Sequence, residues 1–285
     1  AIAARLGRAP HEYRRQIHAR PGDVTPTGQR LSEENGATAC LELALKRADF
    51  AKKYKQVSRG QLRKGQKKLY GVGLAFFAHG SAFTGDGEAK FKAKGRVELA
   101  RLDGGKPVVD IRVSSTEMGQ GVHTIFTQIA ADALALDPAH VRFPLADTGL
   151  VPNSGPTVAS RTTMVVGNVV HRAAQDLKRQ IEAFASLRLF KGAPAELRAS
   201  QLVAKGAKPV PFAKVAKALL AEIGPASGFF QFELPPDIRW DQTTFKGDSY
   251  PGYSWSANVA EVEIDPLTCE IEVKRVTAVV DVGRV

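Results

Sequence analysis

Residues 96–124 read RVELARLDGGKPVVDIRVSSTEMGQGVHT, and this stretch decides the fold class. Two strand-like runs, 96–102 and 108–113, flank a turn at residues 103–107 that contains two consecutive glycines and a proline, a pattern typical of a β-hairpin. A loop with two further glycines follows. From residue 123 to residue 136 the apolar side chains recur at helical spacing. The stretch therefore predicts strand, turn, strand, glycine-rich loop and helix in that order.

The rest of the chain also mixes helical and strand-like segments. Further helices are expected at residues 1–20, 37–55, 162–188 and 212–223, and further strands at residues 71–78, 141–146, 258–264 and 270–282. The last two strands are expected to form a second hairpin, with its turn at residues 265–268. Hairpins are combined with helices without a regular β-α-β alternation, so the sequence predicts an α+β fold.

Composition limits the class of protein. Hydrophobic residues make up 44% of the 285 residues and charged residues 24%, which is ordinary for a globular protein, and no apolar run approaches the ~20 residues of a membrane span. Cys40 and Cys269 are far apart, which argues against a disulfide framework, a zinc site or an iron–sulfur cluster held by this chain alone, and favours the cytoplasm. The chain starts at Ala1 and ends in a strand-like run, so we expect a piece of a longer polypeptide.

The net charge of +11 is concentrated in one segment. Residues 46–68 contain ten Lys and Arg side chains against a single acid, Asp49. Such a cluster is compatible with nucleic-acid binding, but no helix-turn-helix, zinc-finger or RNA-recognition motif accompanies it. A solvated helix and linker, facing water or an acidic partner subunit, explains the charges without a nucleic acid. We expect no nucleic-acid partner.

Two loops have the composition of a ligand site. In residues 114–124, Gly119 and Gly121 bracket Gln120, whose amide both donates and accepts hydrogen bonds and so suits the edge of a heterocycle. Residues 147–163 are rich in small and hydroxyl side chains and lead into a helix, whose N-terminus favours anionic oxygen. Two alternatives remain open for these loops: a structural turn for the glycines and helix capping for the hydroxyls.

Four segments, taken in order, resemble the molybdenum-cofactor domain of the xanthine dehydrogenase and aldehyde oxidase family. They are HGSAFTGDGE (79–88), EMGQG (117–121), GPTVASRTT (155–163), and AEVEID (260–265) with VDVGRV (280–285). The resemblance is close from residue 71 to residue 285 and loose before it. It implies that residues 1–70 are the helical end of a first cofactor-binding region with a basic connector, and that residues 71–285 are a second, C-terminally incomplete cofactor-binding domain.

The resemblance also implies roles for individual residues. Gln120 would hydrogen-bond the pterin, and Ala159 would lie beside the molybdenum. The cofactor-binding residues would be Met118, Gly119, Gln120, Gly121, Thr157, Ala159, Ser160 and Thr162. Phe83 would stack on the substrate ring and Thr84 would lie in the same pocket, although a core position also explains Phe83. His79 and His123 are expected to be structural, and no protein side chain of this chain is expected to bind the metal directly.

The function that the resemblance implies is hydroxylation of purines such as xanthine or hypoxanthine, or of related N-heterocycles, with water as the oxygen source. Aldehyde oxidation is the runner-up, and a non-catalytic cofactor-binding or scaffold subunit is the rival. The cofactor would be molybdopterin or its dinucleotide form, with iron–sulfur clusters and FAD on partner subunits. The family's glutamate base is not found in this chain, which is therefore expected to carry no catalytic residue and to be inactive alone.

Overall fold

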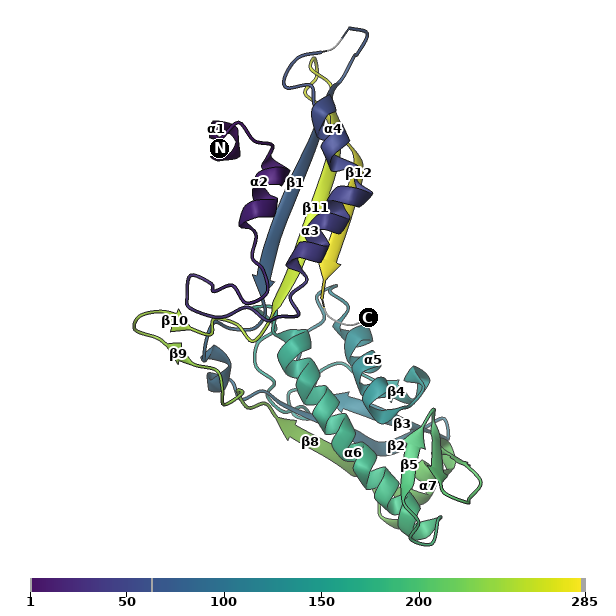
Figure 1. Cartoon of the computed structure of the whole chain (residues 1–285). Coiled ribbons are helices and arrows are strands. Elements are labelled where there is room, and N and C mark those ends of the chain that lie inside the picture. Colours follow the sequence, from purple (N-terminus) through teal and green to yellow (C-terminus); the bar gives the residue numbers. More distant parts are fainter. Residues whose placement is uncertain (1, 63, 283–285) are drawn as a thin grey trace. The chain divides into compact units, whose positions relative to one another are not determined.

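A computed structural model of the chain describes residues 2–62 and 64–282 (Figure 1). Ala1 of the first expected helix, Arg63 of the basic segment and residues 283–285 of the last family-like segment lie outside the described residues. The chain divides into two compact units: residues up to Ser81 together with residues from Trp240 onward, and Ala82–Arg239. Both units combine strands with helices, so the predicted α+β fold is confirmed. The family-based boundary at residue 70 stays a prediction.

The first unit is built on an antiparallel sheet of three strands in the order β1-β11-β12 (Figure 1). Its helices are α1 (Ile2–Arg5), α2 (Pro10–Ile17), α3 (Ala37–Arg47) and α4 (Phe50–Gln56). Its strands are β1 (Leu69–Gly80), β9 (Trp240–Asp241), β10 (Lys246–Gly247), β11 (Tyr253–Ile264) and β12 (Ile271–Asp281). The strands β11 and β12 form the predicted second hairpin.

One face of this sheet carries the core of the first unit. Leu41 and Leu45 of α3 are buried against Ala257 and Val259 of β11, because these side chains alternate toward the same face along the strand. The other face bears exposed apolar side chains on β12, including Val276 and Val280. Burial on one side therefore fixes the strand register.

Two helices expected to be continuous in this unit are broken. The predicted helix over residues 1–20 is two short helices, because Gly7 adopts a positive φ and Pro10 begins the second helix. The predicted helix over residues 37–55 divides at Asp49, which has left-handed backbone angles. Periodicity alone gave one helix in each case and was wrong at these points.

The second unit contains a sheet of four strands in the order β4-β3-β2-β8 and a sheet of three in the order β5-β6-β7. Its strands are β2 (Lys94–Asp103), β3 (Lys106–Arg112), β4 (Val141–Arg142), β5 (Ala195–Arg198), β6 (Gln201–Ala204), β7 (Val210–Pro211) and β8 (Ala226–Gln231). Its helices are α5 (Val122–Leu134), α6 (Gly167–Arg188) and α7 (Phe212–Glu222), with short 3₁₀ helices at Gly87–Lys90 and Pro138–His140 and a π-helical turn at Thr162–Val166.

The predicted hairpin at residues 103–107 is confirmed as the turn between β2 and β3. Gly104 and Gly105 both adopt positive φ, which a two-residue turn between twisted strands requires. The helix α6 crosses the sheet at β8, where a Cβ on Gly228 would lie 2.0 Å from the carbonyl oxygen of Ala173. Only glycine permits this close approach of helix and strand.

Several elements of the second unit differ from the prediction. The strand β8 pairs with β2 but was missed, because residues 226–231 show no clear alternation of apolar and polar side chains. The strands β5, β6 and β7 were missed as well. Of the strand expected at residues 141–146, only the first two residues form a strand, β4. The helix expected from residue 162 begins with a π-helical turn and becomes α-helical at Gly167.

Candidate cofactor-binding site

A hollow of about 420 Å³ lies in the second unit, between the loop that follows β3 and the loop that precedes the π-helical turn. Its lining residues are Met118, Gln120, Thr157, Val158, Ala159, Ser160, Thr162 and Thr163. Six of the eight predicted cofactor-binding residues are among them. The other two, Gly119 and Gly121, belong to the same loop but do not line the hollow. The structure thus brings together two segments that are about forty residues apart in sequence.

The first loop is organised by the carboxylate of Glu117. Its Oε1 accepts hydrogen bonds from the backbone N–H groups of Gly119 at 2.8 Å and Gly121 at 3.0 Å, and its Oε2 accepts one from His123 at 3.1 Å. These bonds, first that from His123, hold the pKa of the Glu117 carboxyl below its usual value. Glu117 therefore accepts hydrogen bonds from backbone N–H groups at the start of α5. The sequence analysis did not predict this role. The sequence feature that could have indicated this role is an acidic residue five positions before the first residue of α5.

Gln120 folds back onto its own loop. Its Oε1 accepts a hydrogen bond from the backbone N–H of Met118 at 2.6 Å, and its Nε2 donates one to the carbonyl of Thr116 at 2.8 Å. An amide group carries two donor hydrogens and two acceptor lone pairs, so Gln120 uses one hydrogen and one lone pair within its own loop. The side chain is exposed and lines the hollow.

Three hydrogen bonds tie the two loops together. The Oγ1 of Thr157 accepts a bond from the backbone N–H of Thr116 at 3.0 Å. The fully buried Ser154 accepts at its Oγ from the N–H of Ser114 at 3.0 Å, while its own N–H donates to the Oγ of Ser114 at 2.9 Å. Ser154 also donates its hydroxyl hydrogen to the carbonyl of Lys94. The walls of the hollow are thus held at a fixed separation.

The second loop has an unusual backbone. Ala159 and Ser160 are consecutive non-glycine residues with φ of 52° and 51°, in the left-handed region. Such conformations are costly and cluster at ligand sites. The π-helical turn that follows is also a feature found mostly at functional sites. Arg161, at the N-cap position of that turn, forms no side-chain capping bond.

Beneath the second loop lies a fully buried ion pair. The Nε of Arg161 donates to both carboxylate oxygens of Glu88, at 2.9 and 3.0 Å, and Nη1 donates to the carbonyls of Ser154 and Pro156, each at 2.9 Å. Both side chains are at most 1% exposed. The sequence analysis did not predict this pair, since the two residues are 73 positions apart.

The predicted substrate residues, Phe83 and Thr84, lie on the Glu88 side of this ion pair. The backbone N–H of Phe83 donates to Glu88 at 3.3 Å, and the Phe83 ring stacks on the ring of Phe91 with centroids 4.9 Å apart. Phe83 is half-buried and Thr84 exposed, and neither lines the hollow described above. The Phe83 ring thus has an aromatic packing partner within the second unit.

The two histidines of the motifs have separate surroundings. The His123 ring packs edge-on against Phe143 at 4.8 Å, and His79 belongs to β1 of the first unit. Among residues 2–62 and 64–282, no group of three or more His, Cys, Asp or Glu side chains is placed to hold a metal ion. In the same residues, no helix is long and apolar enough to span a membrane.

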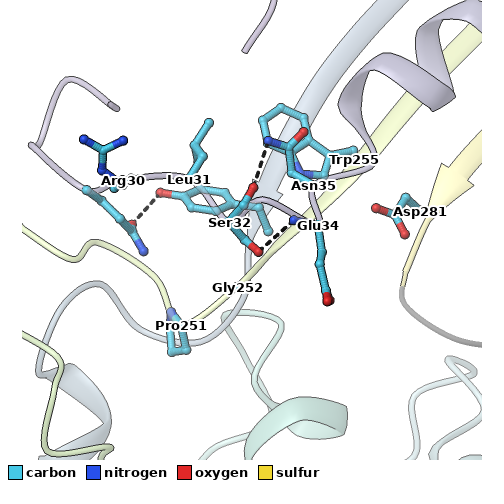
Figure 2. Close-up of a pocket in the computed structure, with 11 residues that line it drawn as sticks. Arg30, Leu31, Ser32, Glu34, Asn35, Pro251, Gly252, Trp255 and Asp281 are labelled. Carbon is cyan, nitrogen blue, oxygen red and sulfur yellow. Dashed lines mark hydrogen bonds between the residues drawn. The ribbon is translucent and has the colours of Figure 1, made fainter. Parts of the chain in front are cut away.

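A second hollow, of about 440 Å³, lies in the first unit and contains none of the predicted site residues. Figure 2 shows it between the segment around Ser32 and the residues leading into β11. Tyr253 donates its hydroxyl to Oε1 of Gln29 at 2.9 Å, and Gln29 donates to the carbonyl of Tyr250 at 2.6 Å. These bonds hold Gln29 against the residues that lead into β11.

The basic segment is partly neutralised within the first unit. Lys53 forms an ion pair with Glu261 at 2.7 Å, and Lys68 forms one with Glu272 at 3.0 Å. These contacts tie α4 and the start of β1 to β11 and β12. At least part of the positive charge thus has a structural role.

The comparison with known proteins now decides the family. The family model described as a molybdopterin cofactor-binding domain matches residues 43–285. The chain belongs to this family, within the xanthine dehydrogenase and aldehyde oxidase group. It is 27% identical over 282 residues to a xanthine dehydrogenase/oxidase of Felis catus, covering 99% of this chain and 19% of that protein. It is 32% identical over 195 residues to the putative xanthine dehydrogenase molybdenum-binding subunit XdhA of Escherichia coli (strain K12), covering 67% of this chain and 24% of that protein.

Solved structures share the fold of this chain. The aldehyde oxidoreductase of Desulfovibrio desulfuricans superposes with a TM-score of 0.70 at 22% identity, covering 99% of this chain and 27% of that one. The quinoline 2-oxidoreductase of Pseudomonas putida 86 superposes with a TM-score of 0.73 at 22% identity, covering 99% and 35%. The chain therefore spans 19% of the xanthine dehydrogenase and 27% and 35% of these two structures.

Proposed function

We propose that the polypeptide to which this chain belongs is a molybdenum hydroxylase, and that the hollow between the two loops holds part of its molybdopterin. The observation that carries this proposal is the lining of the hollow. It combines one amide and four hydroxyl side chains, from Gln120, Thr157, Ser160, Thr162 and Thr163, on two loops that are braced to each other.

The chemistry of the lining fits a phosphorylated pterin. Neutral hydroxyl and amide groups donate hydrogen bonds to phosphate and pterin heteroatoms without adding a competing negative charge. Glu117 is the acidic residue nearest in sequence to the lining residues, and its carboxylate accepts hydrogen bonds from three backbone N–H groups. Ideal Cβ positions on Gly119 and Gly121 meet no atom within 4 Å, so space remains beside the loop. The residues present are therefore suited to the cofactor that the family name implies.

In this proposal each residue has a defined task. Gln120 uses its second amide hydrogen and second lone pair on the pterin. Thr157, Ser160 and Thr162 donate hydroxyl hydrogens to the cofactor's phosphate or pterin side. Ala159 keeps its part of the hollow free of a long side chain, and Met118, Gly119 and Gly121 shape the opposite loop. When bound, the molybdenum cofactor supplies two-electron oxidation of substrate with oxygen derived from water.

The chain does not supply every part of such an enzyme. The carboxylate of Glu117 is fixed by backbone donors and is not placed as a general base. The base is therefore proposed to come from a part of the protein beyond this chain, which alone would be inactive. Iron–sulfur clusters and FAD on partner subunits would accept the electrons, and the partners would be these subunits and the rest of the molybdenum subunit.

The proposed substrates are purines or related N-heterocycles, with aldehydes as the second candidate. The relatives named xanthine dehydrogenase favour the first, while an aldehyde oxidoreductase shares the fold. The deciding experiment supplies the full-length protein with hypoxanthine, xanthine or an aromatic aldehyde in ¹⁸O-labelled water. A purine product that gains one ¹⁸O atom for each hydroxylation step supports the proposal. Oxidation of aldehydes alone would favour the second candidate, and no labelled product from either class would favour a non-catalytic cofactor-binding subunit.

A further inference from the structure

The buried ion pair of Arg161 and Glu88 links the two predicted sites of the second unit. On one side, Arg161 donates to the carbonyls of Ser154 and Pro156 in the cofactor loop. On the other, Glu88 accepts the backbone N–H of Phe83. We propose that Arg161 and Glu88 are a pair of positioning residues that hold the cofactor loop and the Phe83 segment in one arrangement. This inference rests on the proposed function.

The surroundings of Arg161 indicate that the ion pair does more than fill space in the core. A buried charge is costly unless it is paired and hydrogen-bonded, and this guanidinium is 0% exposed. Its Nε and Nη1 make four hydrogen bonds to carboxylate and main-chain oxygens, and its Cζ lies 5.6 Å from the centroid of the Phe91 ring. Phe91 is also the residue on which Phe83 stacks. The guanidinium therefore contacts both segments at once.

Gly155 makes room for the guanidinium in the cofactor loop. It has a φ of 77°, and an added Cβ would lie 3.0 Å from Nη1, 3.1 Å from Nη2 and 3.2 Å from Cζ of Arg161. A methyl group at this position would therefore crowd the guanidinium, and an L-residue would be strained at this φ. Displacing Arg161 is expected to release the left-handed residues Ala159 and Ser160, whose conformation requires support from their surroundings.

Removing one partner and removing both have different consequences. With only Arg161 lost, Glu88 stays buried without a counter-charge, which destabilises the protein. With both replaced by methionine, no buried charge remains, and folding stability is expected to recover. The bonds to Ser154 and Pro156 remain absent in both variants. If the pair positions the loop, cofactor retention therefore stays low even where stability is restored.

The test uses the full-length protein and compares Arg161→Met and Arg161→Met/Glu88→Met with the parent. Molybdenum and pterin content, the melting temperature and backbone amide exchange are measured. We expect the double variant to melt near the parent but to retain cofactor about 10-fold less well, the effect of losing about 1.4 kcal/mol of hydrogen bonding. Amide exchange should accelerate together in residues 82–91 and 153–161. The control Arg179→Met breaks an exposed pair with Asp176 and should change none of these.

The outcomes separate the inference from the proposed function. Full cofactor content and parental exchange in a double variant of parental stability would overturn the inference, because the pair would then be structural only. A parent without pterin would overturn the proposed function. In that case joint acceleration of exchange in the two segments still supports the positioning role, whereas acceleration in one segment alone contradicts it.

Discussion

The Oε2 of Glu117 accepts a hydrogen bond from the backbone N–H of His123 at 3.1 Å, across the entrance to α5. The same carboxylate also holds Gly119 and Gly121. The N–H groups at a helix N-terminus can bind an anionic ligand, but here several N–H groups at and before the start of α5 bind the Glu117 carboxylate. In the proposed cofactor site, the hydrogen bonds to the ligand would therefore come mainly from side-chain hydroxyl and amide groups.

The contribution of Glu117 is expected to depend on pH. Its carboxyl pKa in the folded protein is lowered, chiefly by the N–H of His123, from an ordinary value of 4.5. A lowered pKa means that the stabilisation is fully present above pH 4.5 and is lost as the pH falls through the folded value. Glu117→Gln should therefore accelerate amide exchange in residues 117–123 at neutral pH. Exchange is measured as a function of pH by mass spectrometry.

At acid pH the amide-exchange rates of residues 117–123 in the parent should approach those in the Glu117→Gln variant, because protonation of Glu117 removes the same charge. Loop 153–161 is the internal reference, since Glu117 forms no bond to it that would titrate in this way. A difference between variant and parent that persisted unchanged below the folded pKa would mean that the charge of Glu117 does not order this loop.

Gln120→Ala is expected to lower cofactor retention without unfolding the second unit. The amide of Gln120 is exposed and braces Met118 and Thr116, so its loss affects the loop locally. The lost ligand bonds are worth about 1–2 kcal/mol. Molybdenum and pterin analysis of the purified full-length variant checks this, with the melting temperature as the control for folding. Full occupancy together with parental activity would remove Gln120 from the site.

Ser154→Ala is expected to destabilise the second unit itself. The serine hydroxyl is fully buried, accepts the N–H of Ser114 and donates to the carbonyl of Lys94, so the alanine leaves both groups without this partner. Such a loss costs about 1–3 kcal/mol. Denaturant unfolding of the full-length protein measures it, and Ser227→Ala, at a surface position of β8, is the matched control. Equal stabilities for the two variants would show that the loops are not braced through Ser154.

Phe83→Ala is expected to weaken turnover while leaving molybdenum content near that of the parent. An aromatic face stacked on a flat heterocycle contributes about 0.5–1.5 kcal/mol beyond area burial. The stack on Phe91 gives the ring a second role, so Phe91→Leu serves as the control that removes the stack and keeps Phe83. Steady-state kinetics of both variants separate the roles. Loss of molybdenum together with activity in Phe83→Ala would make Phe83 a core residue.

Local patterns in the sequence were sufficient for part of this structure. The consecutive glycines at 104 and 105 predicted the turn between β2 and β3, because few other residues adopt two positive φ angles in succession. The family-like motifs predicted that residues 117–121 and 155–163 belong to one site, and six of the predicted residues line one hollow. These features depend on short-range geometry or on motifs of several residues.

Other features depend on contacts that a single sequence does not reveal. The break at Asp49 and the pairing of β8 with β2 depend on tertiary packing that outweighs local preference. The partnership of Arg161 with Glu88 joins two charged residues that would each be expected at the surface. The role of Glu117 depends on how the backbone of residues 119–123 turns toward it.

The pterin and molybdenum content of the full-length protein tests the central claim most directly. We expect about one of each per parent polypeptide, and retention about 10-fold weaker in Ser160→Ala/Thr162→Val, which removes two of the proposed ligand bonds. Thr124→Val, at an exposed position of α5 outside the hollow, should keep the parental content. A parent without pterin, or a double variant with the parental content, would contradict the assignment of this hollow to the cofactor.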